Sequence, residues 1–489
     1  MKPMYYLDEK TYLAFAIRKK ELQLLNQQTL AGHSHIFQNN QLLTLSRSES
    51  VAPVEVTRRL TLRHVQSDFK TNALSTRNLV YCDDDVNSML SSLCCVFMVA
   101  QAFALCPVRG ITGRRAEDLS FTWRSIRVFY TIVVILALVV SLGFSFTWFL
   151  IVGFTFTTSG AIMFYVTGLT CCVLFLKLAT KWPEVAMLWQ QTEHNQIRYG
   201  YPTNLRLKIR AMTAVILTLA LVEYVLSNAN RMYIASQCST GTFDLVRRYI
   251  MVTHRHVFGV IGYTTFMALF TSIVSVISSF YWSYADMFIM LVSIALASRF
   301  RLLNYHLKEV RGKVMPECFW RSAREDYNAL SHLTSSVDSC VSSIVLLCFA
   351  TNLFFICQQL LNSINRSLNT IQIVYFYVSF GYLLLRTIAM ALYAASIYDE
   401  SRVAKEVLYA VPAHSYQVEV HRFLIQVATD NVALTGLNFF PVTRTVLLTL
   451  AGTIVTYEVV LVQFGTTSDS SSSNMTALCL DLTTVHYIQ

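Results

Sequence analysis

Apolar residues gather in eight long blocks along the chain, separated by polar segments. The blocks cover residues 87–108, 126–151, 156–179, 209–228, 257–280, 338–362, 371–396 and 443–464. An α-helix of about 20 apolar residues is long enough to cross the hydrocarbon core of a bilayer. The pattern therefore predicts an all-α polytopic membrane protein, with the lipid bilayer as a permanent partner.

The positions of Lys and Arg between the blocks predict the orientation of the chain. Segments 177–210 and 298–337 are rich in both residues, whereas the tail after Phe464 has neither. Because positive charge collects in cytoplasmic segments, the two basic segments should lie inside and the tail outside. One segment disagrees, because the number of crossings puts residues 229–255 outside. It nevertheless carries Arg231, Arg247, Arg248 and Arg255.

Two blocks leave the number of crossings open. Block 87–108 either crosses the membrane or only enters its surface, and only the side of the N-terminal tail depends on the choice. The stretch from Val257 to Ala297 is long enough for two helices. Two crossings there would move the basic segment 298–337 outside. We therefore expect one helix that continues past Asp286 into the cytoplasm.

The composition agrees with this class of protein. Only 14% of the residues are charged and 54% are hydrophobic, whereas soluble domains are about one quarter charged. The net charge of +10 follows from the cytoplasmic basic segments and requires no nucleic-acid partner. Most of the 12 cysteines lie inside apolar blocks, and no spacing resembles a metal site. We expect no enzyme activity, metal or cofactor.

Two pairs of residues on the predicted outer segments are candidates for covalent modification. The two N-x-S/T sequons, at Asn365 and Asn474, both fall outside, where glycans are added. Cys238 and Cys479 are the cysteines of these outer segments. Because the extracellular side is oxidising, a disulfide between them is a hypothesis.

The last apolar block ends in TYEVVLVQF, at residues 456–464. This stretch resembles the C-terminal TYxxxxxQF signature of insect gustatory receptors at all four of its fixed positions. Other stretches resemble the sugar-receptor branch of that family, and the resemblance extends over roughly residues 88–465. These stretches are MVAQAFALCPVRGI (98–111), LFLKLATKWPEV (174–185), YADMFIM (284–290), TNLFFICQQLLN (351–362) and GTIVTYEVVLVQF (452–464).

The resemblance implies seven transmembrane helices, a cytoplasmic N-terminus and an extracellular C-terminus. It further implies a tetrameric, sugar-gated, non-selective cation channel in the plasma membrane of chemosensory neurons, assembled with itself or with related subunits. The expected parts are a largely disordered cytoplasmic tail, a non-crossing helix with its linker, six transmembrane helices with the ligand pocket, a cytoplasmic interface helix, a pore helix and an extracellular tail. They correspond to residues 1–86, 87–123, 124–397, 398–441, 442–464 and 465–489.

One side of the last block has the residues expected of a pore. Residues three and four apart share a helix face, and counting back from Gln463 reaches Val460, Thr456 and Thr453. In a tetramer, Val460 and Gln463 would form an apolar ring and an amide ring at a gate. The alternative is that the threonines bond backbone or neighbouring helices. Glu458 is off this face, so we expect it to contact a neighbouring helix or subunit.

Polar and aromatic residues recur at helical spacing in the predicted outer half of three helices. A sugar site requires amides, carboxylates and hydroxyls beside aromatic rings. The predicted ligand-binding residues are Glu223, Ser227, Asn352, Gln359, Tyr375, Tyr382 and Tyr263, with Tyr165 as a further stacking candidate. Glu223 is the strongest, because acids inside a membrane are rare and mostly functional. Arg386 is a candidate counter-ion for it or a support for the gate.

Several alternatives remain open. Polar residues inside helix bundles often bond only each other, at about 0.6 kcal/mol per contact. The same channel could respond to a bitter or lipid-like compound. A seven-helix G-protein-coupled receptor would have its N-terminus outside, and a secondary transporter would show repeats and broken helices. Residues 415–437 read as an amphipathic helix, which the resemblance makes a cytoplasmic subunit interface, against the alternative of a helix lying on the membrane surface.

Overall fold

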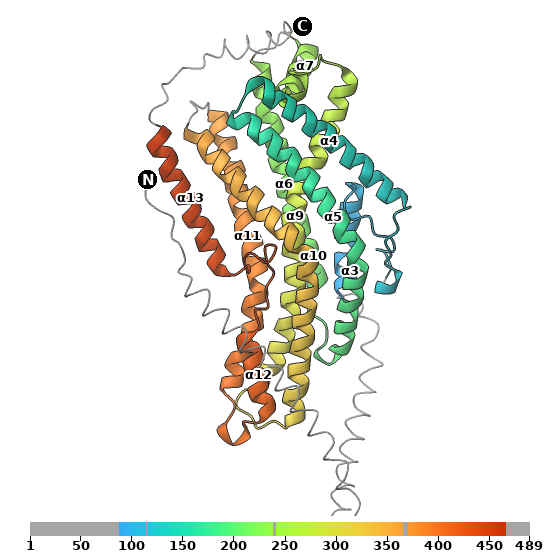
Figure 1. Cartoon of the computed structure of the whole chain (residues 1–489), viewed down its shortest axis with the longest axis vertical. Helices are drawn as coiled ribbons and strands as arrows, with labels where there is room; N and C mark the ends of the chain where they lie inside the picture. The colour runs from blue at the N-terminus through green and yellow to red at the C-terminus, as the bar shows by residue number, and fades with distance from the viewer. Residues whose placement is uncertain (1–87, 114, 238–240, 365–369, 466–489) are drawn as a thin grey trace, which may run out of the picture. The chain divides into compact units, whose positions relative to one another are not determined.

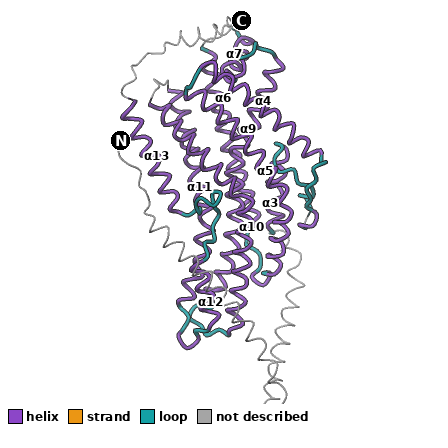
Figure 2. Tube along the Cα trace, viewed as in Figure 1, coloured by secondary structure: helices purple, strands orange, loops and turns teal. Residues whose placement is uncertain are grey.

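The computed structural model describes residues 88–113, 115–237, 241–364 and 370–465. Within these ranges every regular element is a helix (Figures 1 and 2). Isolated bridges join Arg109 to Ser120 and Thr435 to Pro441. The prediction of an all-α protein is therefore confirmed for the part of the chain that is described.

Each predicted apolar block corresponds mainly to one helix, except that block 257–280 begins in α8 and continues into α9, and most helices are longer than their blocks. The first is shorter, because the chain leaves α3 through Ala104 and Cys106, both with positive φ, just before Pro107. The helices are α3 (Met89–Ala102), α4 (Ile126–Val152), α5 (Phe156–Asn195), α6 (Leu205–Ser236), α7 (Thr242–Thr253), α8 (Arg255–Phe258), α9 (Thr265–Glu309), α10 (Glu317–Ile364), α11 (Thr370–Tyr409), α12 (Val418–Thr429) and α13 (Arg444–Gly465), with 3-10 turns η2 (Ala116–Asp118), η3 (Ile197–Tyr199) and η4 (Ala413–Ser415).

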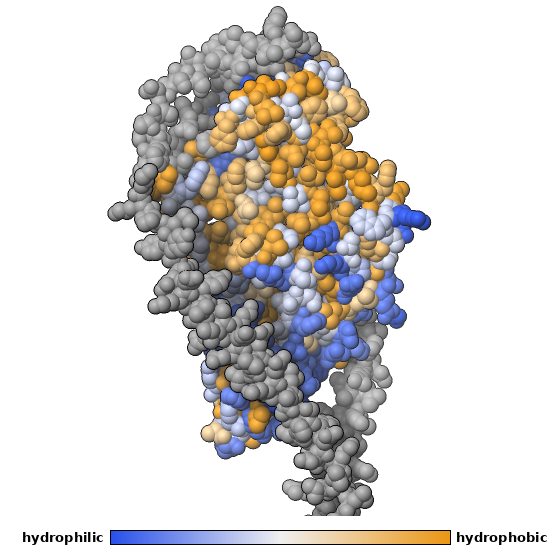
Figure 3. Space-filling view, in the orientation of Figure 1, coloured by the Kyte–Doolittle hydropathy of each residue, from blue (hydrophilic) through white to orange (hydrophobic). Residues whose placement is uncertain are grey.

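The longest helices exceed the thickness of a bilayer. α10 has 48 residues and at about 1.5 Å per residue extends roughly 70 Å, more than twice the about 30 Å of the hydrocarbon core. Figure 3 shows apolar residues over the upper parts of the helices and hydrophilic residues over their lower parts. In the stretch from Val257 to Ala297 one long helix, α9, continues past Asp286, as predicted, but it begins only at Thr265, because Val257 and Phe258 belong to the short helix α8.

Among the described residues, five helices are long and apolar enough to cross a membrane, namely α4, α5, α6, α10 and α11, while α3 and α13 are shorter apolar helices. α9 lies in the middle of the bundle and packs against α5, α6, α10 and α11 (Figure 1). Its residues from Ser283 to Leu291 are all buried. Tyr284 and Phe288 pack there against Phe175 of α5. A side chain on this part of α9 is therefore enclosed by four helices.

The predicted amphipathic helix is shorter than expected. Residues 415–437 contain α12 only from Val418 to Thr429, with Phe423 buried. The segment beyond Thr429 is bonded to α10 instead, because Asp338 accepts hydrogen bonds from the backbone N–H and hydroxyl of Thr435, both at 2.7 Å. At the start of α12, Arg324 of α10 donates to Glu419 at 2.9 Å and lowers the pKa of that carboxyl.

Candidate functional site

Residues from three helices meet in a hydrogen-bonded group that we call the outer cluster, formed by Glu223, Ser227, Gln359, Tyr375 and Ser379. The hydroxyl of Ser379 donates to Oε1 of Glu223 at 3.1 Å and accepts from Nε2 of Gln359 at 3.3 Å. The hydroxyl of Tyr375 donates to Ser227 at 3.2 Å. The structure thus joins α6, α10 and α11. Four of the five residues were predicted as ligand-binding residues, and Ser379 is the fifth.

A second group, the deep cluster, consists of Trp282, Ser283, Asp286, Asn352 and Arg386. Nε of Arg386 lies 2.8 Å from Oδ2 of Asp286, which also accepts from Nδ2 of Asn352 at 3.0 Å. Oδ1 of Asn352 accepts from Arg386 at 3.2 Å and from the Trp282 indole at 3.0 Å. The direct ion-pair partner of Arg386 is therefore Asp286 rather than Glu223.

Aromatic rings pack against Arg386 of the deep cluster. The guanidinium carbon of Arg386 is 4.5 Å from the ring centroid of Trp282 and 5.3 Å from that of Tyr382. The Trp282 ring lies 4.6 Å from that of Phe355. Tyr382 is three residues after Ser379 on α11, so both side chains share a helix face. The Tyr382 ring therefore lies about one helical turn from Ser379 of the outer cluster.

In the deep cluster, Oδ1 of Asp286 is buried without a hydrogen-bond partner among the described residues. Two further atoms of this kind lie in the outer cluster and on Tyr382. They are Oε1 of Gln359 and the hydroxyl oxygen of Tyr382. A buried polar group without a partner costs about 1–3 kcal/mol. Glu223 also retains acceptor capacity, because a carboxylate has about four lone-pair sites and the hydrogen bond from Ser379 uses one. The outer cluster can therefore bond further hydroxyl groups.

The two other tyrosines considered for ligand binding lie elsewhere. The ring of Tyr263, between α8 and α9, is 5.4 Å from that of Phe258 and beneath Arg247. Tyr165 bonds His256 at 3.2 Å. No described contact joins either ring to the outer cluster, so the structure does not bring them to the predicted site.

The predicted pore residues lie on α13. The hydroxyls of Thr453 and Thr456 bond carbonyl oxygens four residues earlier in the same helix, at 2.9 and 2.8 Å. Both threonines and Val460 are exposed in the single chain. The side chains of Glu458 and Gln463 lie outside the described residues. So do the candidate disulfide and glycosylation residues Cys238, Cys479, Asn365 and Asn474.

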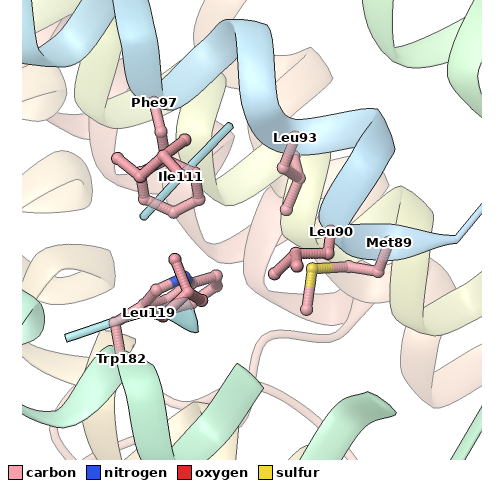
Figure 4. Close-up of a pocket in the computed structure, with 7 residues that line it drawn as sticks. All are labelled: Met89, Leu90, Leu93, Phe97, Ile111, Leu119 and Trp182. Carbon is pink, nitrogen blue, oxygen red and sulfur yellow. The ribbon is translucent and has the colours of Figure 1, made fainter. Parts of the chain in front are cut away.

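A small apolar cavity lies under α3, away from both clusters (Figure 4). It holds about 10 Å³, which is about the space for one water molecule. The cavity is too small for a sugar, and its lining residues have neither carboxylate nor amide side chains. The lining residues are Met89, Leu90, Leu93, Phe97, Ile111, Leu119 and Trp182.

The residues that α9 contributes to the deep cluster were not predicted from the sequence. Asp286, Trp282 and Ser283 bond α10 and α11, but only Asp286 was considered, and only to define the length of the helix. An acid inside an apolar block was the available signal, because such a charge needs a partner. Arg386 was the matching signal on α11.

Known proteins with similar sequences agree with the resemblance. A family model described as the trehalose receptor matches residues 71–477. The gustatory receptor for sugar taste 64f of Drosophila melanogaster is 38% identical over 377 residues, which is 76% of this chain and 80% of that protein. The gustatory receptor 5a for trehalose of the same species is 36% identical over 76% of this chain and 83% of that protein.

The fold is similar to that of a solved insect olfactory receptor. The insect olfactory receptor OR5 from Machilis hrabei matches with a TM-score of 0.56. The match covers 75% of this chain and 96% of that one at 14% identity. At this identity the likeness concerns the fold alone.

Proposed function

Because the chain belongs to the sugar-receptor branch of the insect gustatory receptor family, we propose that it is a subunit of a sugar-gated, non-selective cation channel. In this proposal it acts as a sweet-taste receptor in the plasma membrane of chemosensory neurons. The ligand is a mono- or disaccharide, and the names of the similar receptors, sugar taste and trehalose, support that class.

The observation that carries the proposal is the incomplete hydrogen bonding of the outer cluster. The carboxylate of Glu223, the free acceptor of Gln359 and the hydroxyl of Tyr382 come from three helices that Ser379 and its neighbours join. Sugar hydroxyls donate and accept, and sugar ring faces are apolar. Such a ligand would fill the unused hydrogen-bonding positions and cover the Tyr382 ring.

The membrane arrangement that we propose has seven crossings, by α4, α5, α6, α9, α10, α11 and α13. α3 does not cross, the N-terminus is cytoplasmic and the C-terminus is extracellular. The hydrophilic lower parts of α9, α10 and α11 (Figure 3) support a cytoplasmic extension of the bundle. The outer cluster then lies in the outer half of the membrane.

In the proposed channel, α13 lines the pore of a homo-tetramer or of a hetero-tetramer with related subunits. Thr453, Thr456, Val460 and Gln463 face the permeant cations. Exposure of the first three in the single chain supports this. Sugar binding opens the pore only as far as the open state binds sugar more tightly than the closed state, and such coupling is typically about 1–3 kcal/mol.

The nearest alternative is the same channel gated by a non-sugar tastant. A site for an apolar compound has little use for the acid and amide of Glu223 and Gln359, which favour a sugar. The likeness to an insect olfactory receptor supports a fold of this kind rather than that of a G-protein-coupled receptor.

The test is whole-cell current in cells that express this chain alone, during application of mono- and disaccharides. We expect a sugar-evoked cation current that Glu223→Ala abolishes at unchanged surface expression. Val225→Ala is the matched control, because Val225 lies on the same helix and is 57% exposed. Surface tetramers that respond to an apolar compound and to no sugar would contradict the proposed ligand class.

A further inference from the structure

The arginines of segment 229–255, which disagree with the positive-inside pattern, lie beside aromatic and acidic side chains. Nε of Arg248 is 2.7 Å from Oδ2 of Asp244. The guanidinium carbon of Arg247 lies 5.3 Å from the ring centroid of Tyr263, and that of Arg255 lies 5.9 Å from the ring of Trp148. These contacts provide local roles for three of the four arginines, so their charge need not mark a cytoplasmic segment.

The helix that carries two of these arginines has an apolar side turned away from the protein. α7 contains no buried residue. Phe243 is 93% exposed and Val246 is 50% exposed, and their spacing of three places them on one helix face. Asp244 and Arg248 bond each other on another face. A helix with these two faces is of the type that lies at a lipid–water interface.

The exposed face of α7 continues an apolar surface that lipid must cover. α7 packs against α6 and α8, and α8 packs against α4. Large apolar side chains are exposed on the outer parts of α6, α4 and α9 and in the connection after α4. Figure 3 shows apolar residues up to the end of the bundle where α7 lies. They include Val225, Met232, Leu150, Phe154, Phe266 and Leu269.

We propose that α7 is an interfacial helix, with Phe243 and Val246 inserted among phospholipids of the outer leaflet. The occupant of this face is lipid rather than a second subunit, because the apolar surface is continuous with that of the membrane-crossing helices. Arg247, one position after Val246, lies over Tyr263. Basic and aromatic side chains of this kind are typical of the membrane–water interface.

An interfacial α7 would connect the lipid to the outer cluster. The hydroxyl of Tyr249 donates to Oδ1 of Asn228 on α6 at 2.8 Å. Asn228 follows Ser227, which accepts the hydrogen bond of Tyr375. The outer end of α6 is thus held by a helix that the membrane surface positions.

The test uses the full chain in phosphatidylcholine vesicles, with the photoreactive residue p-benzoylphenylalanine replacing Phe243 or, separately, Val246. Irradiation followed by mass spectrometry should find phospholipid adducts at both positions. Leu136 of α4, 59% exposed, is the control that should react with lipid, and Val314, 63% exposed between α9 and α10, is the control that should not.

Two outcomes would overturn the proposal. One is crosslinking of positions 243 and 246 to a second copy of the chain, which would make this face a subunit contact. The other is the lack of lipid adducts at both positions while Leu136 gives them, which would place α7 in water. Neither outcome depends on sugar responses, so the proposal is tested separately from the proposed channel function.

Discussion

The deep cluster and the outer cluster use the same pair of helices, α10 and α11, but differ in how they bond their polar groups. In the deep cluster Asp286 and Asn352 are fully buried, and the carboxylate is matched by Arg386. In the outer cluster Glu223 has the hydroxyl of Ser379 as its partner, and Gln359 retains an unbonded oxygen. The deep cluster thus contains a buried ion pair, whereas the outer cluster is joined through amide and hydroxyl groups.

This difference has a physical reason. A buried charge must be paired, because its desolvation costs several kcal/mol. The buried Asp286 carboxylate therefore requires Arg386 beside it. Amides and hydroxyls that accept fewer hydrogen bonds than they can are less costly, at about 1–3 kcal/mol each. A ligand that satisfies them recovers that free energy. The following variants separate the two kinds of site.

The largest effect should come from Arg386→Ala. It leaves the Asp286 carboxylate buried without its cation, which we expect to destabilise the protein by about 3–5 kcal/mol. Thermal unfolding of the purified protein in detergent measures the change. The double variant Asp286→Asn, Arg386→Gln removes both charges and should recover part of the loss. An unchanged unfolding temperature for Arg386→Ala would remove the structural role of the deep cluster.

Glu223→Gln should act on binding and leave stability nearly unchanged. A hydrogen bond to a charged group contributes about 1.5–3 kcal/mol, so the sugar concentration for half-maximal current should rise roughly 10- to 150-fold. Unfolding temperature and concentration–response curves are measured on the same variant. If stability falls while the sugar response stays normal, Glu223 belongs with the structural residues.

Tyr382→Phe should have a smaller effect. Comparison with Tyr375→Phe separates an effect on sugar binding from an effect on stability. The Tyr382 hydroxyl has no partner among the described residues, so its removal should raise stability rather than lower it, and should weaken sugar binding by about 0.5–1.5 kcal/mol. Tyr375 donates to Ser227, so its removal should lower stability by a similar amount. Equal effects of both variants on stability would show that the Tyr382 hydroxyl is bonded within the protein.

The smallest effect should be a pH dependence at the outer end of the bundle. Burial lowers the pKa of His254 to about 3 and that of His256 to about 4. Both pKa values lie below about 6.5, the value expected for an unfolded chain. At pH values above about 6.5 the stability contributed by the two buried, neutral histidines is fully present. At lower pH the unfolded chain binds more protons than the folded protein, and stability falls.

Between pH 7 and pH 6 the loss should be less than about 1 kcal/mol for each histidine. Unfolding temperatures at the two pH values measure it, and His254→Gln should reduce the difference. The same pH dependence in the variant and the unchanged protein would mean that His254 does not titrate differently on unfolding.

Local patterns in the sequence predicted the helices and part of the site. Helical spacing placed Glu223, Gln359 and Tyr375 on faces that meet, because residues of one helix keep a fixed angular relation. Tyr263 was not brought to the site, because it lies in a connection whose path no periodic pattern describes. The end of α12 was also missed, since Asp338, almost 100 residues earlier, bonds the segment beyond it.

The central claim is that a sugar occupies the outer cluster, and cryo-electron microscopy of the channel with its most effective sugar tests it directly. We predict ligand density within hydrogen-bonding distance of Glu223 and Gln359, with a sugar ring over Tyr382. Density at another site, with the Glu223–Ser379 hydrogen bond intact and no ligand near Gln359, would contradict it.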